Sequence, residues 1–302
     1  MTSSRPLLLI SILALALGGC SIKSVAMNAV ADALSSGTGG SFSQDEDLEF
    51  VGDALPFALK MMESINDSVP DHVGMKVTLA SGFTQYGVVF VEWPAEQLKY
   101  DDFQAYDAGK TRARVFYWRA NSFALDGLDL MEPDFRSRIL SDTDAVLKEM
   151  EVESVPLLYW LGASWLAAAL TNLEDPEMFG IFPVAASVLQ RAYELDPDWN
   201  EGAIRELFIS LEPVLPMPGG KERSKEHYDA VIGMRGGKSA GPHVSYATAV
   251  ALKVQDKDEF VRLLEMALAV EVEGEPESRL ANEYAQSKAR FLLDHLDDLF
   301  LE

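Results

Sequence analysis

From Asp45 onward, apolar residues recur every three or four positions almost without interruption. Residues at this spacing fall on one face of an α-helix, so the pattern predicts a succession of amphipathic helices. One short run, residues 87–91 (Gly-Val-Val-Phe-Val), has the composition of a strand, but it lies inside a longer helical period. The pattern therefore predicts an all-α fold for residues 46–302.

The same stop signal occurs three times along this helical region. Residues 70–72 (Pro-Asp-His), 133–135 (Pro-Asp-Phe) and 197–199 (Pro-Asp-Trp) are separated by 63 and 64 residues. Proline ends a helix, and aspartate can cap the helix that follows. Near-equal spacing of such a signal predicts stacked helical hairpins.

The helices around the third stop signal resemble a tetratricopeptide unit. A small residue such as Gly162 lets two helices approach, and a bulky residue one turn away fills the gap between hairpins. The pattern predicts a tetratricopeptide-like array, an α-solenoid, with expanded hairpins. We expect an entry helix over residues 46–67, hairpins near 71–131, 155–196, 199–235 and 243–271, and a closing helix over 277–300. The matching positions are Leu158, Leu161, Gly162 and Trp165 in the first helix, and Ala185, Leu189, Ala192 and Pro197 in the second.

The N-terminus has the layout of a lipoprotein signal. Arg5 precedes an apolar run, residues 7–17, that is too short to span a membrane, and Leu-Gly-Gly-Cys ends at Cys20. We interpret residues 1–19 as a signal peptide, Cys20 as a lipidated N-terminus, and residues 20–45 as anchor and flexible linker. Ser21 after the cysteine favours the outer membrane. The alternative is an ordinary signal peptide with a chance cysteine.

Charge and cysteine content narrow the class of partner. The chain has 48 acidic and 25 basic residues and a net charge of −23. This charge argues against binding to nucleic acid and against binding to anionic lipid through a basic face. Cys20 is the only cysteine, so the exported chain has no disulfide and is held together by packing alone.

Residues 155–173 carry no charge, but they include polar side chains and have acidic flanks. We interpret them as a buried helix rather than a transmembrane span.

No motif points to catalysis, a metal or a cofactor. Residues 236–239 (Gly-Gly-Lys-Ser) resemble the end of a phosphate-binding loop, but the required first glycine is missing and a helix, not a strand, is expected before them. We interpret the glycines as a helix stop. The four histidines lie outside any metal-binding or nucleophile motif. The sequence therefore predicts a protein that is not an enzyme.

Aromatic residues are the candidates for a binding site. Tyr117 and Trp118 lie on one predicted helix, and Tyr159 and Trp160 lie on another, with Trp165 close by. Core packing is one interpretation. The other is that some of them line a groove or pore that meets an apolar ligand or a partner peptide. A cationic edge accompanies the first group, formed by Arg112, Arg114 and Arg119.

Segments over most of the mature chain resemble the T-component (TatT) proteins of tripartite ATP-independent periplasmic (TRAP) transporters. The most specific are residues 155–160 (Val-Pro-Leu-Leu-Tyr-Trp) with Trp165, and residues 195–199 (Leu-Asp-Pro-Asp-Trp). The other segments are residues 53–60, 113–128, 237–242 and 279–290.

This resemblance implies a periplasmic lipoprotein that forms a homotrimer, with a channel-like opening in each subunit. It also implies docking with the transporter's solute-binding protein and handling of a small or hydrophobic ligand. Two alternatives remain open: an envelope assembly or chaperone lipoprotein built on the same helical array, and, more remotely, an exported hydrolase.

Overall fold

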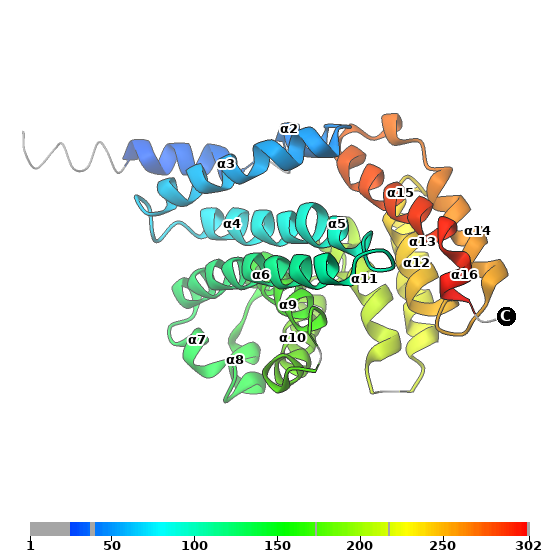
Figure 1. The fold of residues 1–302 in the computed structure, drawn as a ribbon. Helices are drawn as coiled ribbons and strands as arrows, with labels where there is room; N and C mark the ends of the chain where they lie inside the picture. Colours follow the sequence, from blue (N-terminus) through cyan, green and yellow to red (C-terminus); the bar gives the residue numbers. More distant parts are fainter. Residues whose placement is uncertain (1–24, 37–39, 173, 217, 301–302) are drawn as a thin grey trace, which may run out of the picture.

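The computed structural model describes residues 25–36, 40–172, 174–216 and 218–300 (Figure 1). Within these ranges the chain forms helices and connecting turns, and no strand. The predicted all-α class is therefore confirmed. The expected signal peptide, residues 1–19, and Cys20 lie outside the described residues.

The helices follow one another with short connections. Residues 25–35 form the first one. Two stretches are π-helical, Tyr86–Glu92 and Ala247–Ala251, and short 3-10 turns occupy Val152–Ser154, Glu212–Val214, Val272–Gly274 and Pro276–Ser278. The α-helices are α2 (Gly40–Ser43), α3 (Leu48–Asn66), α4 (Val73–Gln85), α5 (Trp93–Glu96), α6 (Phe103–Met131), α7 (Phe135–Arg138), α8 (Thr143–Glu149), α9 (Val155–Leu170), α10 (Pro176–Leu195), α11 (Trp199–Leu211), α12 (Gly220–Met234), α13 (Gly241–Tyr246), α14 (Lys257–Leu268), α15 (Arg279–Asp294) and α16 (Leu296–Leu299).

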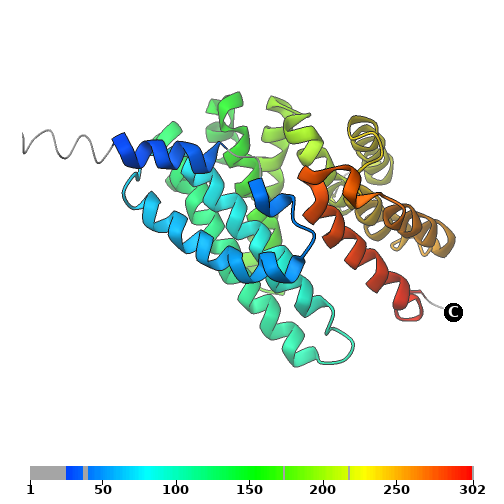
Figure 2. The same ribbon diagram turned by 90° about the horizontal axis from the view of Figure 1, so that it is seen from above.

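Successive long helices pack against each other in pairs. Helix α4 lies along α6, α9 along α10, α11 along α12, and α14 along α15, while α6 also packs on α9 and joins neighbouring pairs (Figures 1 and 2). This arrangement is compatible with the predicted tetratricopeptide-like array. The predicted entry helix over 46–67 corresponds to α3, and the predicted closing helix over 277–300 corresponds to α15 and α16.

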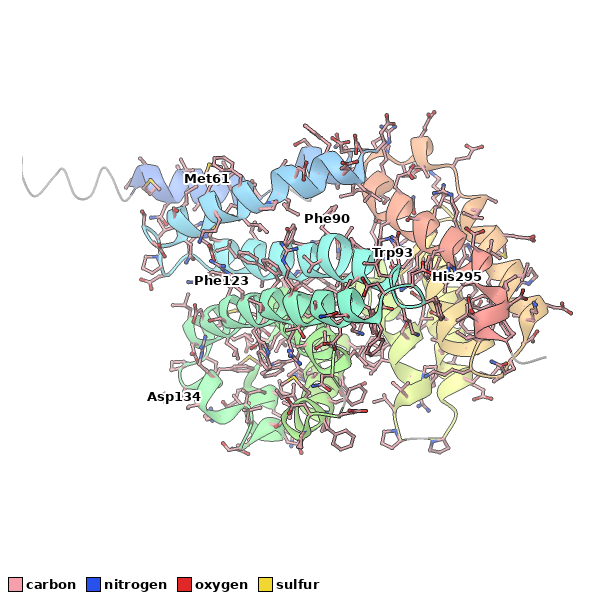
Figure 3. The ribbon with its side chains drawn as sticks, viewed as in Figure 1. Met61, Phe90, Trp93, Phe123, Asp134 and His295 are labelled. Carbon is pink, nitrogen blue, oxygen red and sulfur yellow. The ribbon has the colours of Figure 1, made fainter. Side chains whose placement is uncertain are left out.

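The two ends of the array meet through aromatic side chains. The Trp93 ring lies edge-on to Tyr284 and Phe291 of α15, at centroid distances of 6.1 and 5.4 Å, and its Nε1–H donates to Ser287 Oγ at 3.3 Å. Phe291 in turn packs on His295, and both labelled residues, Trp93 and His295, can be followed in Figure 3. The C-terminal helix therefore covers an edge of the N-terminal half.

Helix α9 is the most apolar helix of the fold, and it is buried. Trp165 and the leucines before the last turn have at most 6% of their surface exposed, and only Leu170 at the end of the helix is exposed. A Cβ atom on Gly162 would lie 2.5 Å from Cγ of Leu189 on α10, so only glycine permits this approach of the two helices. Among the described residues, no helix has the length and hydropathy needed to cross a membrane. The interpretation of this segment as a buried helix is confirmed for Val155–Leu170, whereas residue 173 lies outside the described residues.

The N-terminal caps of the helices that follow the three stop signals differ from the prediction. His72, not Asp71, caps α4: its Nδ1 accepts the Met75 N–H at 3.0 Å, while its Nε2 lies 2.9 Å from Asp32 Oδ1. Asp134 and Asp198 do occupy the N-cap positions of α7 and α11, but neither side chain accepts a capping bond.

Residues 25–35 form a helix, so this part of segment 20–45 differs from the flexible linker that the sequence predicted. Met27, Ala31 and Leu34 are spaced to form one helical face, and Ala31 is fully buried against the body. This face packs into the cluster that includes Leu59 and Met75. The folded body therefore begins well before residue 46.

Candidate functional site

The structure places Tyr117, one of the four predicted binding aromatics, in the interior. Its side chain has no exposed surface, and its hydroxyl donates to a Glu92 carboxylate oxygen. Gly87, in the π-helix Tyr86–Glu92, lies directly against this ring. A Cβ atom at this position would stand 2.5 Å from Cε1 of Tyr117, so the contact requires glycine. Burial, and then the nearby Glu92 charge, raise the pKa of Tyr117 above its ordinary value. Tyr117 cannot contact a surface ligand in this conformation.

Tyr159 and Trp160 form a second, half-buried aromatic group. The Tyr159 ring centroid lies 4.8 Å from that of Trp160 and 4.9 Å from that of Trp199 at the start of α11. Burial and the charge of Glu206 raise the pKa of Tyr159. Trp118 is half-buried and, like Tyr159 and Trp160, packs against the core around α9 and α10. Trp118 also packs against the cluster that contains Tyr117, so it lies between the two groups, and only Tyr159 and Trp160 are separate from Tyr117.

The predicted cationic edge on α6 is partly neutralised. Arg119 donates through Nε and Nη2 to both carboxylate oxygens of Glu63, each at 2.5 Å, and lies over the Phe83 ring at 4.8 Å. Arg112 lies over the Phe116 ring at 5.8 Å. These arginines join α6 to α3 and to aromatic faces, so much of their charge is already engaged.

An exposed apolar row on α3 is a surface that the sequence reasoning missed. Phe50, Phe57 and Met61 have 63%, 75% and 45% of their surface exposed, and α3 runs along one edge of the molecule (Figure 3). With Ala54 they occupy positions 50, 54, 57 and 61, the 4-3-4 spacing of a helix-packing seam. We call these four residues the α3 row. The opposite face of α3, including Leu59, is buried, so this helix is apolar on two sides.

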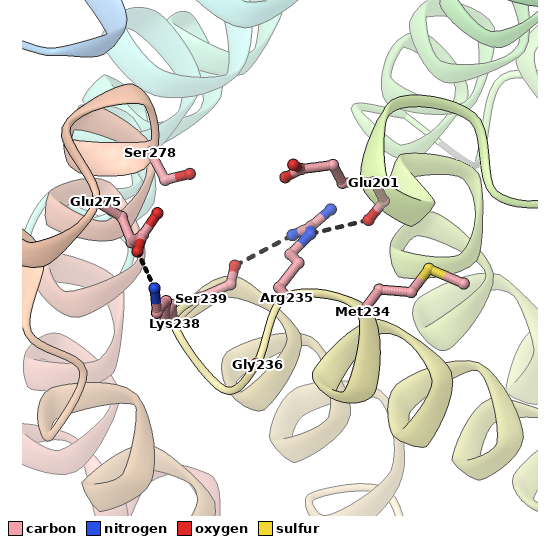
Figure 4. A pocket seen from close by; sticks show the side chains of 8 residues that line it. All are labelled: Glu201, Met234, Arg235, Gly236, Lys238, Ser239, Glu275 and Ser278. Carbon is pink, nitrogen blue, oxygen red and sulfur yellow. Dashed lines mark hydrogen bonds and ion pairs between the residues drawn. The ribbon is translucent and has the colours of Figure 1, made fainter.

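The glycine-rich turn after α12 lines a polar cavity. Gly236 and Gly237 have φ values of 57° and 73°, and the Gly237 N–H donates to Ile232 O at 3.1 Å, which ends the helix as predicted. A helix rather than a strand precedes the turn, so the geometry of a phosphate-binding loop is absent here. The cavity has a volume of about 300 Å³ (Figure 4). It is lined by Glu201, Met234, Arg235, Gly236, Lys238, Ser239, Glu275 and Ser278.

The buried histidines have structural surroundings. The His227 ring packs on Tyr193 and Phe208, and burial lowers its pKa below the ordinary value. His243 is also buried and shares a hydrogen bond of 2.8 Å with the Tyr228 hydroxyl. In the part of the chain that the structure describes, no three His, Cys, Asp or Glu side chains gather as a metal site would require.

Fold and surface together define an all-α protein of paired helices with an exposed apolar helix face, a class suited to binding other proteins. The chain belongs to the TRAP transporter T-component family, whose sequence profile matches residues 44–300. This confirms the resemblance recognised in the sequence. The family is a transporter component and not an enzyme family, which supports an accessory role in a TRAP transporter.

One relative matches this chain over most of its own length. The chain is 28% identical over 304 residues to a protein of Treponema pallidum (strain Nichols), and the match covers 94% of each chain. That protein is described only as uncharacterized, so it adds no partner or ligand.

Proposed function

We propose that this protein is a lipid-anchored periplasmic accessory subunit that docks the solute-binding protein of its TRAP transporter through the α3 row. The observation that carries the proposal is the exposed row itself, on a member of a transporter-component family. Two phenylalanine rings and a methionine left in water on one helix face are costly unless a partner covers them. Fully burying one such side chain contributes about 1.5–3 kcal/mol.

The charge around the row favours a protein partner over anionic lipid. Glu49 and Asp53 share the exposed face of α3, and Lys60 is the one basic side chain on that helix. An apolar strip edged by acids suits a partner with an apolar patch and basic surroundings, because opposite charges steer the encounter. The acidic net charge of the chain gives the same preference.

Membrane attachment and assembly complete the proposal. Cys20 lies five residues before Val25, where the described chain begins, so a lipid on Cys20 would hold the folded body close to the membrane. A diacylglyceryl group with an amide-linked acyl chain anchors stably, whereas one chain does not. Ser21 favours the outer membrane. We expect Cys20→Ala to leave the membrane fraction, and equal fractionation of the two proteins would rule out the anchor.

The remaining part of the proposal concerns assembly and ligand. We propose a homotrimer in which each subunit handles a small or hydrophobic ligand, with Trp118, Tyr159 and Trp160 as its aromatic contacts. The part of each residue that remains exposed beside the core supports this role. Tyr117 is buried and would act only as part of the supporting core.

A capture experiment from the native envelope tests the docking proposal. Phe57→Ser removes the most exposed ring of the α3 row, and Phe179→Ser is the matched control, because Phe179 is 69% exposed on α10. We expect wild type and Phe179→Ser to recover the solute-binding protein and Phe57→Ser to lose most of it. Equal recovery by both variants would contradict the proposal. Recovery of other envelope proteins in its place would favour an assembly or chaperone function.

A further inference from the structure

We propose that the polar cavity beside the turn after α12 binds a small zwitterion of the amino-acid class, with one carboxylate and one ammonium group. The proposal concerns a site away from the α3 row and does not depend on docking. The volume of the cavity, about 300 Å³, is at the lower end of the range of small-molecule sites. Its walls come from three segments that are distant in sequence: the start of α11, the end of α12 with its turn, and the residues just before α15.

One side of the cavity offers hydrogen-bond donors for a carboxylate. Arg235 donates through Nε to Glu201 O and through Nη1 to Glu206 and Ser239, while its Nη2 has no partner among the described residues. Lys238 pairs with a Glu275 carboxylate oxygen and keeps two further N–H donors. The Ser239 oxygen accepts from Arg235, so its own O–H is free to donate.

The Ser278 hydroxyl adds to the donor side. It has no hydrogen-bond partner in the part of the chain that the structure describes, and it does not cap α15, although it stands at the N-cap position. In Figure 4 it extends into the opening from the side opposite Glu201. Guanidinium, ammonium and hydroxyl donors that face one space are the groups that bind carboxylates.

The other side offers an acceptor for an ammonium group. The Glu201 carboxylate makes no hydrogen bond or ion pair with any described residue, and Figure 4 shows it extending into the opening. Its backbone is held in the left-handed region, with φ values of 48°, 54° and 79° at Asn200, Glu201 and Gly202. The bond from Arg235 Nε to Glu201 O, 3.0 Å long, supports this turn. The turn therefore fixes where an unpaired carboxylate stands.

The charge balance favours a zwitterion over a simple anion or amine. Arg235 and Lys238 are each paired with a carboxylate, Glu206 and Glu275, which leaves free donors but no free positive charge. A lone anion would therefore meet the unpaired Glu201 charge, and a lone amine would use the acceptor side of the cavity without gaining hydrogen bonds from the donors. A molecule that carries both groups satisfies both sides. Met234 adds an apolar wall for a short aliphatic side chain.

Three matched probes test the chemistry. Norleucine carries both groups, hexanoate is the same molecule without the ammonium, and pentylamine is the same chain without the carboxylate. Calorimetric titration of the full chain, purified in detergent, should give norleucine an affinity at least about tenfold above either analogue, the ratio expected for one charged hydrogen bond. Absent norleucine binding, or equal binding of all three, would overturn the proposal.

A conservative variant locates the site. Glu201→Gln should weaken norleucine about tenfold without weakening hexanoate, because the ammonium loses its charged acceptor while the carboxylate loses only a repulsive neighbour. The matched control is Glu226→Gln, an exposed change on α12 outside the cavity, which should bind norleucine like wild type. Thermal unfolding confirms that each variant is folded. Norleucine binding that is unaffected by Glu201→Gln would place the ligand elsewhere and refute this site.

Discussion

Replacing Gly162 by alanine tests the closest helix contact in the core. The new Cβ would stand 2.5 Å from Cγ and 2.9 Å from Cδ2 of Leu189, both shorter than van der Waals contact. Leu189 is itself completely buried and enclosed by the α9–α10 core, so its side chain has no open space to move into. We therefore expect Gly162→Ala to destabilise the fold, although alanine is the better helix former.

The magnitude follows from two opposing terms. Overpacking a well-packed core costs about 1–3 kcal/mol, and replacing glycine by alanine inside a helix returns about 1 kcal/mol. The expected net loss for Gly162→Ala is about 1 kcal/mol. Gly162→Leu drives a longer side chain into the same contact and should reach the upper end of the overpacking range, about 3 kcal/mol.

Gly180 provides the control with the opposite sign. It lies inside α10, and a Cβ there would meet no atom within 4 Å. Gly180→Ala should therefore stabilise the protein by about 0.5–1 kcal/mol. The assay is urea unfolding of the chain from residue 21 onward, with midpoints compared at unchanged slope. Stabilisation by both alanines would refute the close approach of α9 and α10.

Two further predictions concern the core and its histidines. Trp165→Ala, at a residue with 3% of its surface exposed, should cost about 3–5 kcal/mol in urea unfolding, and Trp118→Ala, at a partly buried residue, should cost less. Burial lowers the folded-state pKa of both His227 and His243 below the unfolded value of about 6.5, so the unfolded chain binds protons first as the pH falls. The free energy of unfolding should therefore decrease as the pH falls from about 7.5 to about 5.5. The decrease should be larger in wild type than in the variant with both histidines changed to Gln, and an equal dependence of the free energy on pH in the two proteins would contradict this.

The sequence predicted the interior of this fold better than its surface. Trp165 and Gly162 could be predicted because helix packing imposes a spacing on large and small residues that the chain must repeat. The cap of α4 could not be predicted, because aspartate is in general a better capping residue than histidine. His72 caps the helix in place of Asp71 because its tertiary contact with Asp32 positions the ring.

The candidate sites were harder to predict because their signals overlap with core signals. Tyr117 and Tyr159 have similar aromatic neighbours in sequence, yet Tyr117 is completely buried against a π-helical turn and Tyr159 is only partly buried. The α3 row shares the helical period of the buried face, so periodicity alone cannot tell the two faces apart. The carboxylate of Glu201 is positioned by a left-handed turn whose only sequence signal is a glycine after asparagine and glutamate.

The most direct test of the central claim is calorimetric titration of the purified chain with the purified solute-binding protein of the same transporter, at several temperatures. Burial of the α3 row predicts binding with a negative heat-capacity change that weakens strongly in Phe57→Ser and is retained in Phe179→Ser. No binding by wild type, or the same affinity and heat-capacity change in both variants, would contradict the claim that this row docks the transporter's solute-binding protein.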